Sequence, residues 1–557
     1  MPTPTSRRPG ITTWLIAWVV FSVLGGLWAL ASPILSVPDE SSHAVYAAAA
    51  ARGQIWAPAI GTETFVQLPA DYKTVHDING CYVFQPNVAA GCAPEFSPQA
   101  GEVEITTRAG RYPPAYYAFA GLGSLVTDGA KAIYAMRLLT VALVAGFLAS
   151  ATCSILGRRN RAMGLVGLGL ATTPMLFFFA GAVNPQSPEI AASILLWVSG
   201  TALLTRLRDE PDVPLTFANA DLRRVLIALV ALPLIRPLSL FWLAVIVAGL
   251  LLAFGSWPAI RRLLTARPVL VGLPVVLAAI GSNLWWVFVR DAMVAEDLTG
   301  YATLRAPEAM QISVAKLSEE YDEMIGVFGW LSTPAPGAVY VLFSLLLGGL
   351  ALLTALQSRA RQNITVTLLA VAVMATPVMF EMLSYRTSQF GWQGRYTLPI
   401  AVGIPLLLGM SDGASRLTGP VPRRFLLTAS AGLVVIHVLS FLGALDRHVF
   451  GINGFWGITD PGWAPPLGFS SLVLGALLVT VAGAVLANRA AAQEEAVDVD
   501  GDHDDYADHD DHDDRSHDDD ETTQFERPVE GDPWSTAPVY GRGRRPVNGS
   551  RADAEVH

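Results

Sequence analysis

Long apolar runs alternate with short polar connections along the chain. A helix that crosses a bilayer needs about 20 mostly apolar residues. The run at 225–254 is too long for one span and contains Pro233, Arg236 and Pro237, so it predicts a hairpin of two short helices. The other runs predict spans at residues 11–35, 132–156, 162–183, 190–205, 269–289, 338–356, 364–383, 397–410, 425–445 and 467–486. The pattern therefore predicts an all-α polytopic membrane protein of about twelve transmembrane helices.

Arginines concentrate in alternate connections, around residues 158–161, 206–224, 261–267, 358–361 and 416–424, and they also precede the first run at Arg7 and Arg8. Loops rich in lysine and arginine remain on the cytoplasmic side. We therefore expect both termini to be cytoplasmic, in the cell membrane. The first run lacks a convincing cleavage site and is interpreted as a retained signal anchor.

The same pattern divides the chain into a cytoplasmic N-terminus at 1–11, a transmembrane domain at 12–488 and a tail at 489–557. Two large loops, 36–130 and 291–337, are expected on the extracytoplasmic side, the second with a helix around 307–328. The tail is dense in aspartate and contains His503, His509, His512 and His517. Such a segment cannot bury enough apolar surface to fold, so disorder is predicted; a weak metal-binding tract is the alternative.

Composition agrees with a membrane protein, since 52% of the residues are hydrophobic and 15% are charged. Soluble proteins carry about 25% charged residues. The formal net charge of -10 comes largely from the tail. No basic footprint of a nucleic-acid-binding protein is present, so the expected surroundings are a lipid bilayer and no nucleic acid.

The first large loop is too long for a simple linker and predicts a small folded unit. It contains Cys81 and Cys92, which are expected to form a disulfide if the loop is extracytoplasmic; two free thiols are the alternative. Tyrosines at 112–117 and a short apolar run to Val126 predict an interfacial helix at the end of the loop.

Two acids and a histidine follow the first span directly, as Asp39, Glu40 and His43. Pro38 ends the span because it disfavours helix at the residue before it. Carboxylates near a membrane face are costly unless they face protein or water, which favours a functional role. Alternatively, the two acids only cap a helix that begins near Ser41.

The predicted topology gathers further polar residues on the side where these acids emerge. They come from the outer ends of widely separated spans. They are Asn184, Glu189, Arg236, Glu381, Arg386 and Arg395. Most charged residues near the membrane would therefore share one face.

Four short motifs carry a family resemblance. They are Pro38-Asp39-Glu40 with His43, Tyr112-Pro113-Pro114 with Tyr116-Tyr117, Asn184-Pro185, and Gly394-Arg395-Tyr396 with Pro399. Over residues 12–450 the chain resembles the bacterial domain-of-unknown-function family 2142. Gln186 stands where that family's pattern leads us to expect an acid. The family in turn resembles the GT-C superfamily of membrane glycosyltransferases.

The resemblance implies inverting transfer of a sugar from a polyprenyl-phosphate-linked donor to a glycan or lipid acceptor of the cell envelope. Transfer needs a base, for which Asp39 is the first candidate and Glu40 the second. The two acids could instead hold a divalent cation, Mg²⁺ or Mn²⁺. His43 would orient Asp39.

Cations would hold the leaving phosphate, with Arg395 and Arg386 the first candidates and Arg236 next. Sugar or lipid contacts are expected from the aromatic side chains of Tyr116, Tyr117, Trp392 and Tyr396, and substrate contacts from Asn184 and Glu381. The alternatives are ordinary interface anchors for the aromatics, a snorkelling role for Arg395 and an ion pair with an arginine for Glu381.

Two other functions fit a polytopic protein with buried charges. A transporter or flippase of lipid-linked glycans would place those charges near the midplane. A non-catalytic membrane protein of envelope assembly would not need intact acids. The expected clustering at one face, beside a long loop, favours the enzyme.

Overall fold

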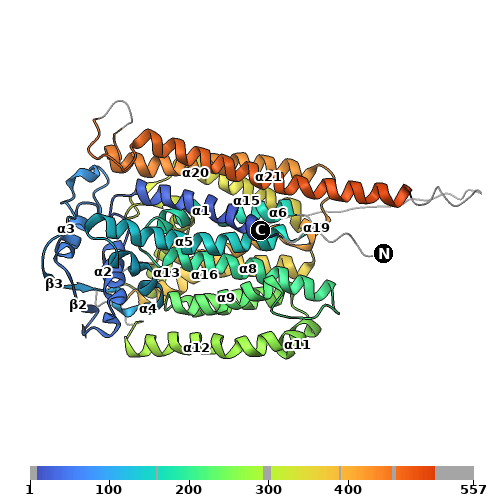
Figure 1. The fold of residues 1–557 in the computed structure, drawn as a ribbon, viewed down its shortest axis with the longest axis horizontal. Helices are drawn as coiled ribbons and strands as arrows, with labels where there is room; N and C mark the ends of the chain where they lie inside the picture. The colour runs from blue at the N-terminus through green and yellow to red at the C-terminus, as the bar shows by residue number, and fades with distance from the viewer. Residues whose placement is uncertain (1–8, 159–160, 293–302, 388–389, 455–459, 508–557) are drawn as a thin grey trace, which may run out of the picture. The chain divides into compact units, whose positions relative to one another are not determined.

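The computed structural model describes residues 9–158, 161–292, 303–387, 390–454 and 460–507, the last 14 of these as backbone only. Helices pack side by side as a bundle, and a small unit with a β-sheet lies at one end of it (Figure 1). Nine helices of the described residues are long and apolar enough to cross a membrane, or ten if one bent pair counts as a span. The predicted all-helical polytopic fold is confirmed, whereas the count of about twelve crossings is not.

The main elements fall into three groups. The first loop unit comprises α2 (Glu40–Ala51), α3 (Val75–Gly80), α4 (Pro114–Gly121), β1 (Ala59–Ile60), β2 (Glu63–Pro69) and β3 (Glu102–Thr107). The second loop holds α13 (Ala306–Ala315), α14 (Leu317–Gly326), β4 (Val327–Phe328) and β5 (Thr333–Pro334). The bundle consists of α1 (Ile11–Ala31), α5 (Gly129–Leu156), α6 (Arg161–Ala171), α7 (Pro174–Ala180), α8 (Gln186–Asp209), α9 (Ala220–Ile235), α10 (Ser239–Phe254), α11 (Trp257–Thr265), α12 (Arg267–Val289), α15 (Gly337–Ala355), α16 (Ala360–Ser384), α17 (Gly394–Ala401), α18 (Gly403–Gly409), α19 (Asp412–Arg416), α20 (Val421–Phe450) and α21 (Phe469–Ala507).

Prolines explain where the helices break. The predicted hairpin at 225–254 is present as α9 and α10, which are separated at Arg236 and Pro237. Each has 16 residues, short of the length expected for a full span. The predicted single span at 162–183 is instead a pair, α6 and α7, bent by 59°. Pro174 lacks a backbone N–H and begins α7, so the helix restarts there in a new direction.

Two further boundaries differ from the expected ones. The single helix expected around 307–328 is two helices, α13 and α14, followed by the β4–β5 pair. The last helix, α21, continues past the expected end at 488 to Ala507. The rest of the predicted disordered tail, and the N-terminal arginines, lie outside the described residues.

The first loop folds into a small unit, as predicted, and its core also includes Ile133 and Met136 of α5. Its antiparallel sheet has the order β1-β2-β3, and Val66 faces Ile105 across β2 and β3. Buried alanines of α2 pack against apolar residues of the sheet and of α4. A disulfide joins Cys81 to Cys92, whose Cα atoms are 5.7 Å apart.

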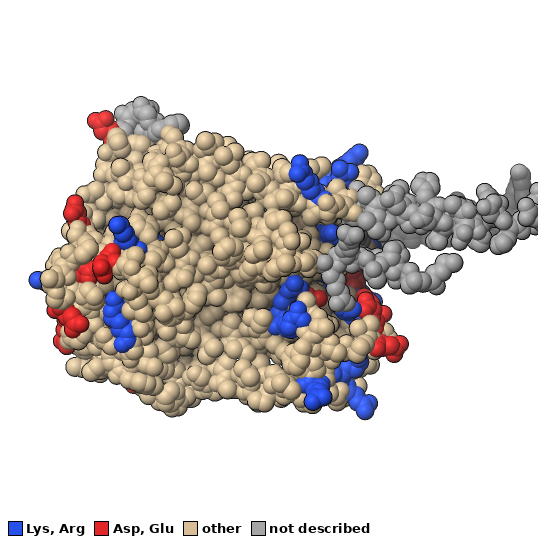
Figure 2. All heavy atoms as spheres, in the orientation of Figure 1, with Lys and Arg blue, Asp and Glu red and all other residues tan. Residues whose placement is uncertain are grey.

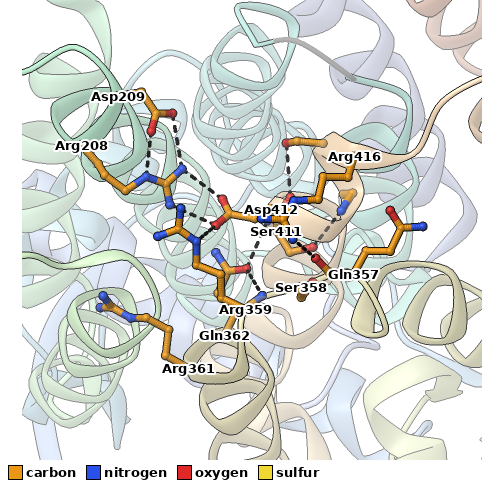
Figure 3. Close-up of polar contacts among 12 residues, drawn as sticks. Arg208, Asp209, Gln357, Ser358, Arg359, Arg361, Gln362, Ser411, Asp412 and Arg416 are labelled. Atoms are coloured by element: carbon orange, nitrogen blue, oxygen red, sulfur yellow. Dashed lines mark hydrogen bonds and ion pairs between the residues drawn. The ribbon is translucent and has the colours of Figure 1, made fainter.

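Charged side chains gather at both ends of the bundle, with a broad uncharged belt between them on the face seen in Figure 2. At the end away from the sheet, Asp412 is held by two arginines (Figure 3). Its carboxylate lies 3.0 Å from Arg208 and 2.6 Å from Arg359, while its backbone N–H donates to Gln362. These contacts join the ends of α8, α16 and α19. The belt is the surface expected to face lipid.

The crossing of α2 and α4 depends on a glycine. A Cβ built on Gly121 would lie 1.9 Å from the carbonyl oxygen of Ala47, so the two helices meet backbone to backbone. Both helices carry residues of the site described below.

We expect Gly121→Ala to lower the free energy of unfolding by about 1–3 kcal/mol, because the added methyl must push α4 away from α2. Gly80→Ala is the control, since a Cβ there meets nothing within 4 Å. Chemical unfolding of the purified protein measures both variants. Equal stability of the two would contradict the close approach.

Candidate functional site

A fully buried ion pair fixes the chain at the start of α2. The Glu40 carboxylate accepts from Arg137 of α5 at 2.7 Å and 2.6 Å, and both side chains are fully buried. Arg137 also donates to the carbonyls of Ala29, Ser32 and Pro33. All five N–H donors of the guanidinium are therefore used.

This arrangement argues against the predicted catalytic and metal-binding roles of Glu40. One of its oxygens also accepts from the backbone N–H of Val183, so both oxygens are engaged and neither reaches solvent. Glu40 therefore acts as a structural tie between α1, α2, α5 and the end of α7.

Asp39 lies beside the Glu40–Arg137 ion pair and is accessible to solvent. Its backbone has a φ of +64°, in the left-handed region, which aspartate tolerates better than most residues. Its side chain is 48% exposed and makes no hydrogen bond that caps α2. The alternative of a simple helix cap therefore does not describe Asp39.

Arg395 lies far from Asp39 in the sequence but contacts it in the structure. Its Nη2 donates to the Asp39 carboxylate at 3.1 Å, across 356 positions of sequence. The Arg395 side chain is only 4% exposed and packs over the rings of Phe179 and Tyr396. A buried cation thus lies behind a half-exposed carboxylate.

Arg236 forms the second cation of the site. It donates to Glu189 and to Gln186 of α8, in each case at 2.9 Å, and lies over the rings of Tyr112 and Tyr396. The break between α9 and α10 places this side chain, because Arg236 is the residue that directly follows the end of α9 at Ile235.

The side-chain amides of Asn184 and Gln186, at the start of α8, connect Pro38 to Arg395. Asn184 donates to the carbonyl of Pro38 at 3.2 Å, and Gln186 donates to the carbonyl of Arg395 at 2.9 Å. Gln186 therefore bridges the two arginines, a contact that the acid expected at this position could not make because it lacks an N–H donor.

His43 lies one helical turn after Asp39, on the buried side of α2. Its Nδ1 is 2.8 Å from the hydroxyl of Tyr117, and its ring also meets the ring of Tyr112. Burial lowers the pKa of His43 to about 4, against the opposing effect of the Asp39 charge. Burial raises the pKa of Tyr117, so both partners stay neutral at physiological pH.

Two of the predicted site residues lie outside this group, and a third lies at its buried edge. Tyr116 is buried, its ring packs against the ring of Tyr117 at 5.1 Å, and its hydroxyl is 3.0 Å from that of Thr140 of α5. Arg386 is exposed and contacts Tyr385. Glu381 pairs with Lys316, and not with the arginine that the alternative expected, at 2.7 Å. The structure therefore assembles Asp39, His43, Tyr117, Asn184, Arg236, Arg395 and Tyr396, with Tyr116 packed behind Tyr117, and it separates Arg386 and Glu381 from them.

The donor set does not fit the divalent cation considered for Asp39 and Glu40. A bound Mg²⁺ or Mn²⁺ needs free oxygen ligands, and the oxygens of Glu40 are engaged by Arg137 and Val183. Among the described residues no group of three or more His, Cys, Asp or Glu could hold a metal ion.

An apolar groove of about 540 Å³ runs between α13 and α16. Methionine and aliphatic side chains line it, among them Met310, Met374, Met379 and Leu383. Its α16 wall continues to Glu381, whose partner Lys316 also donates to the carbonyl of Trp392. Trp392 in turn meets the ring of Tyr396 at 5.6 Å, so the groove and the site share neighbouring elements.

Reasoning from the sequence overlooked three residues of the site. Arg137 is a single arginine inside an otherwise apolar span, a pattern that could have marked it, since such residues are rare and paired. In the sequence, Tyr112 stands out only as part of a motif, and Gln186 only as a departure from one. No sequence pattern reveals that Gln186 bridges Arg236 and Arg395.

The model of the family described as "Predicted membrane protein (DUF2142)" matches residues 21–404. The chain belongs to this family. The matched DUF2142 region includes every residue assembled around Asp39 and ends within α18, before α20 and α21.

Comparison with curated proteins finds no match. Among solved structures, the crystal structure of ArnT from Cupriavidus metallidurans bound to undecaprenyl phosphate is similar to this DUF2142 protein. The two are 14% identical with a TM-score of 0.43, over 86% of this chain and 77% of ArnT.

We expect Glu40→Gln to lower the free energy of unfolding by about 3–5 kcal/mol, because it leaves Arg137 as an uncompensated buried charge. Glu63→Gln is the matched control. Glu63 pairs with Arg108 at 2.9 Å, but that pair is exposed and should contribute at most about 1 kcal/mol. Chemical unfolding compares the two variants, and a Glu40→Gln effect as small as the control's would refute the structural tie.

A second prediction concerns pH. The pKa of His43 is lower in the folded protein, about 4, than its ordinary 6.5. The unfolded chain therefore binds the proton more tightly, and stability is lost as the pH falls from about 6.5 through about 4. His43→Gln should reduce this loss, whereas His76→Gln, at an exposed position, should leave it unchanged. Melting temperatures across this range test the expectation, which fails if both variants follow the wild type.

Proposed function

We propose that this protein is a membrane glycosyltransferase that moves a sugar from a polyprenyl-phosphate donor to a hydroxyl of a cell-envelope acceptor. The observation that carries the proposal is the contact between a half-exposed carboxylate, Asp39, and a buried guanidinium, Arg395. One group can accept a proton and the other can hold a phosphate. The resemblance of the family to GT-C enzymes suggests the reaction that needs both.

Asp39 would act as the general base. Its carboxylate takes the proton of the acceptor hydroxyl as the oxygen attacks the anomeric carbon of the sugar. The bond between that carbon and the phosphate oxygen breaks, and polyprenyl phosphate leaves with the electron pair. The half-exposed Asp39 side chain supports this role because an acceptor hydroxyl can reach it.

Arg395 and Arg236 would hold the phosphate. Guanidinium groups match phosphate oxygens in pairs, and both arginines are preoriented by the rings beneath them. The Nε atoms of both are buried without a hydrogen-bond partner among the described residues. Donors that already lack water lose little solvation when an anion binds.

Aromatic and apolar surfaces support the rest of the substrate. Tyr112 and Tyr396 border the two arginines and could pack against the sugar. The groove between α13 and α16 offers an isoprenoid chain an apolar surface lined by adaptable methionines.

The arrangement favours transfer over transport. The charged residues of the site lie where α2, the start of α8, the α9–α10 break and the start of α17 meet, at the end of the bundle that carries the sheet. The proposed location is the extracytoplasmic face of the cell membrane, with both termini in the cytoplasm. A site at one end suits an enzyme better than a carrier that must open to both sides.

Asp39→Asn should lower turnover of a polyprenyl-phosphate sugar by about 10²–10⁴-fold, because the amide cannot accept the proton. The measurement is release of polyprenyl phosphate by purified protein with an added acceptor. Asp77→Asn, at an exposed position in α3, is the control and should keep full activity.

Since the amide introduced by Asp39→Asn keeps the size of the carboxylate, unfolding temperatures of the two variants should agree with the wild type. Full activity of folded Asp39→Asn protein would refute Asp39 as the base.

A further inference from the structure

A second group of charged residues lies beside Gly394, the residue before Arg395. Lys316 and Glu320, at the junction of α13 and α14, meet Glu381 of α16. Lys316 donates to one oxygen of Glu381 at 2.7 Å. The other oxygen of Glu381 and both oxygens of Glu320 are buried without a hydrogen-bond partner among the described residues. Glu320 is 1% exposed and Glu381 is 2% exposed.

The charges of this group do not balance if every carboxyl is ionised. Glu323, one turn along α14, adds a third acid, and the exposed Glu319 acts from the same helix. Lys316 is the cation that faces Glu320, while Arg395 acts on Glu323 from α17. Three largely buried carboxylates face Lys316 and Arg395, and Arg395 already pairs with Asp39. Full ionisation would therefore leave a net negative charge in a poorly solvated place, which is strongly unfavourable.

Either a bound metal ion or a proton can remove that excess charge. Within the described ranges, no three or more His, Cys, Asp or Glu side chains are arranged to hold a metal ion. The unpartnered oxygens of Glu320 instead suit a neutral carboxylic acid, which is much less costly to bury than a carboxylate.

We propose that Glu320 carries a proton at neutral pH and that this proton keeps α14 packed against the start of α17, which holds Arg395 on Asp39. Burial, with repulsion from Glu381 next, raises the pKa of Glu320 to about 8. The proton is therefore bound across the physiological range and lost under mildly alkaline conditions.

The contact between α14 and α17 shows how the proton acts on the site. A Cβ built on Gly394 would lie 1.9 Å from the carbonyl oxygen of Glu320, so the two backbones touch. The Gly394 N–H donates to Glu323 at 2.6 Å, and Arg395 is the next residue. A new charge on Glu320 repels Glu323 and Glu381, which loosens α14 from α17 and frees Arg395 to move away from Asp39.

Infrared spectroscopy of the full-length protein in lipid nanodiscs tests the proton directly, because a protonated carboxyl has its own C=O stretch. In a pH titration we expect the wild type to show such a band at pH 7 that is lost with a midpoint near 8. Glu320→Gln should lack this band. The exposed Glu319→Gln control should retain it with an unchanged midpoint.

A second variant tests the proposal even if Glu320→Gln fails to fold. Glu381→Gln removes the nearest repelling charge and should lower the midpoint of the Glu320 band by about one pH unit or more. Absence of a band at pH 7 in the wild type, or a band that persists in folded Glu320→Gln, would overturn the proposal. So would stabilisation of the wild type by Mg²⁺ or Mn²⁺ that Glu320→Gln abolishes, since the site would then hold a metal ion.

The link to Asp39 rests on the proposed function and has its own readout. Sugar transfer by the wild type should fall as the pH rises through about 8, while Glu320→Gln should keep its activity above that pH. If the two proteins had parallel pH profiles, the Glu320 proton would have no effect on sugar transfer. If no transfer were detected for either protein, the proposed function would fail. The infrared result would still show whether Glu320 is protonated.

Discussion

The buried pair between Glu40 and Arg137 is the interaction on which the site depends. It satisfies three carbonyls at the end of α1 and one backbone N–H after α7 through two side chains. Asp39 stands directly before α2 with a positive φ, and its carboxylate is half-exposed.

The site around Asp39 is exposed on one side and buried on the other. The exposed side is formed by the half-exposed Asp39 carboxylate. Behind it, Arg395 and Arg236 are held by rings, by Glu189 and by the Gln186 bridge, so that both cations are fixed before any ligand binds. Preoriented charges of this kind stabilise a developing anion more strongly than mobile ones, because they need not reorganise.

Much of the architecture could be predicted from the sequence because apolar length and arginine placement are local patterns. The helical hairpin at Arg236 and the folded first loop with its two cysteines both follow from such patterns. The broken α6–α7 span did not, since a proline within an apolar run can bend a helix or start a new one, and packing decides which.

The roles of individual charges were harder to predict. Asp39 and Glu40 are neighbours in sequence with the same chemistry, yet one is open and the other is sealed by Arg137. That difference depends on a partner 97 positions away, which no local pattern reveals. The same holds for Glu381, whose partner is a lysine of the second loop.

We infer that Arg395 and Asp39 share one substrate site. Binding of polyprenyl phosphate to the purified protein, compared between Arg395→Gln and the exposed Arg386→Gln, tests it most directly. Loss of a buried charged hydrogen bond should weaken binding by at least about tenfold in Arg395→Gln, while Arg386→Gln should bind as the wild type does. Equal affinity of both variants and the wild type would contradict the account.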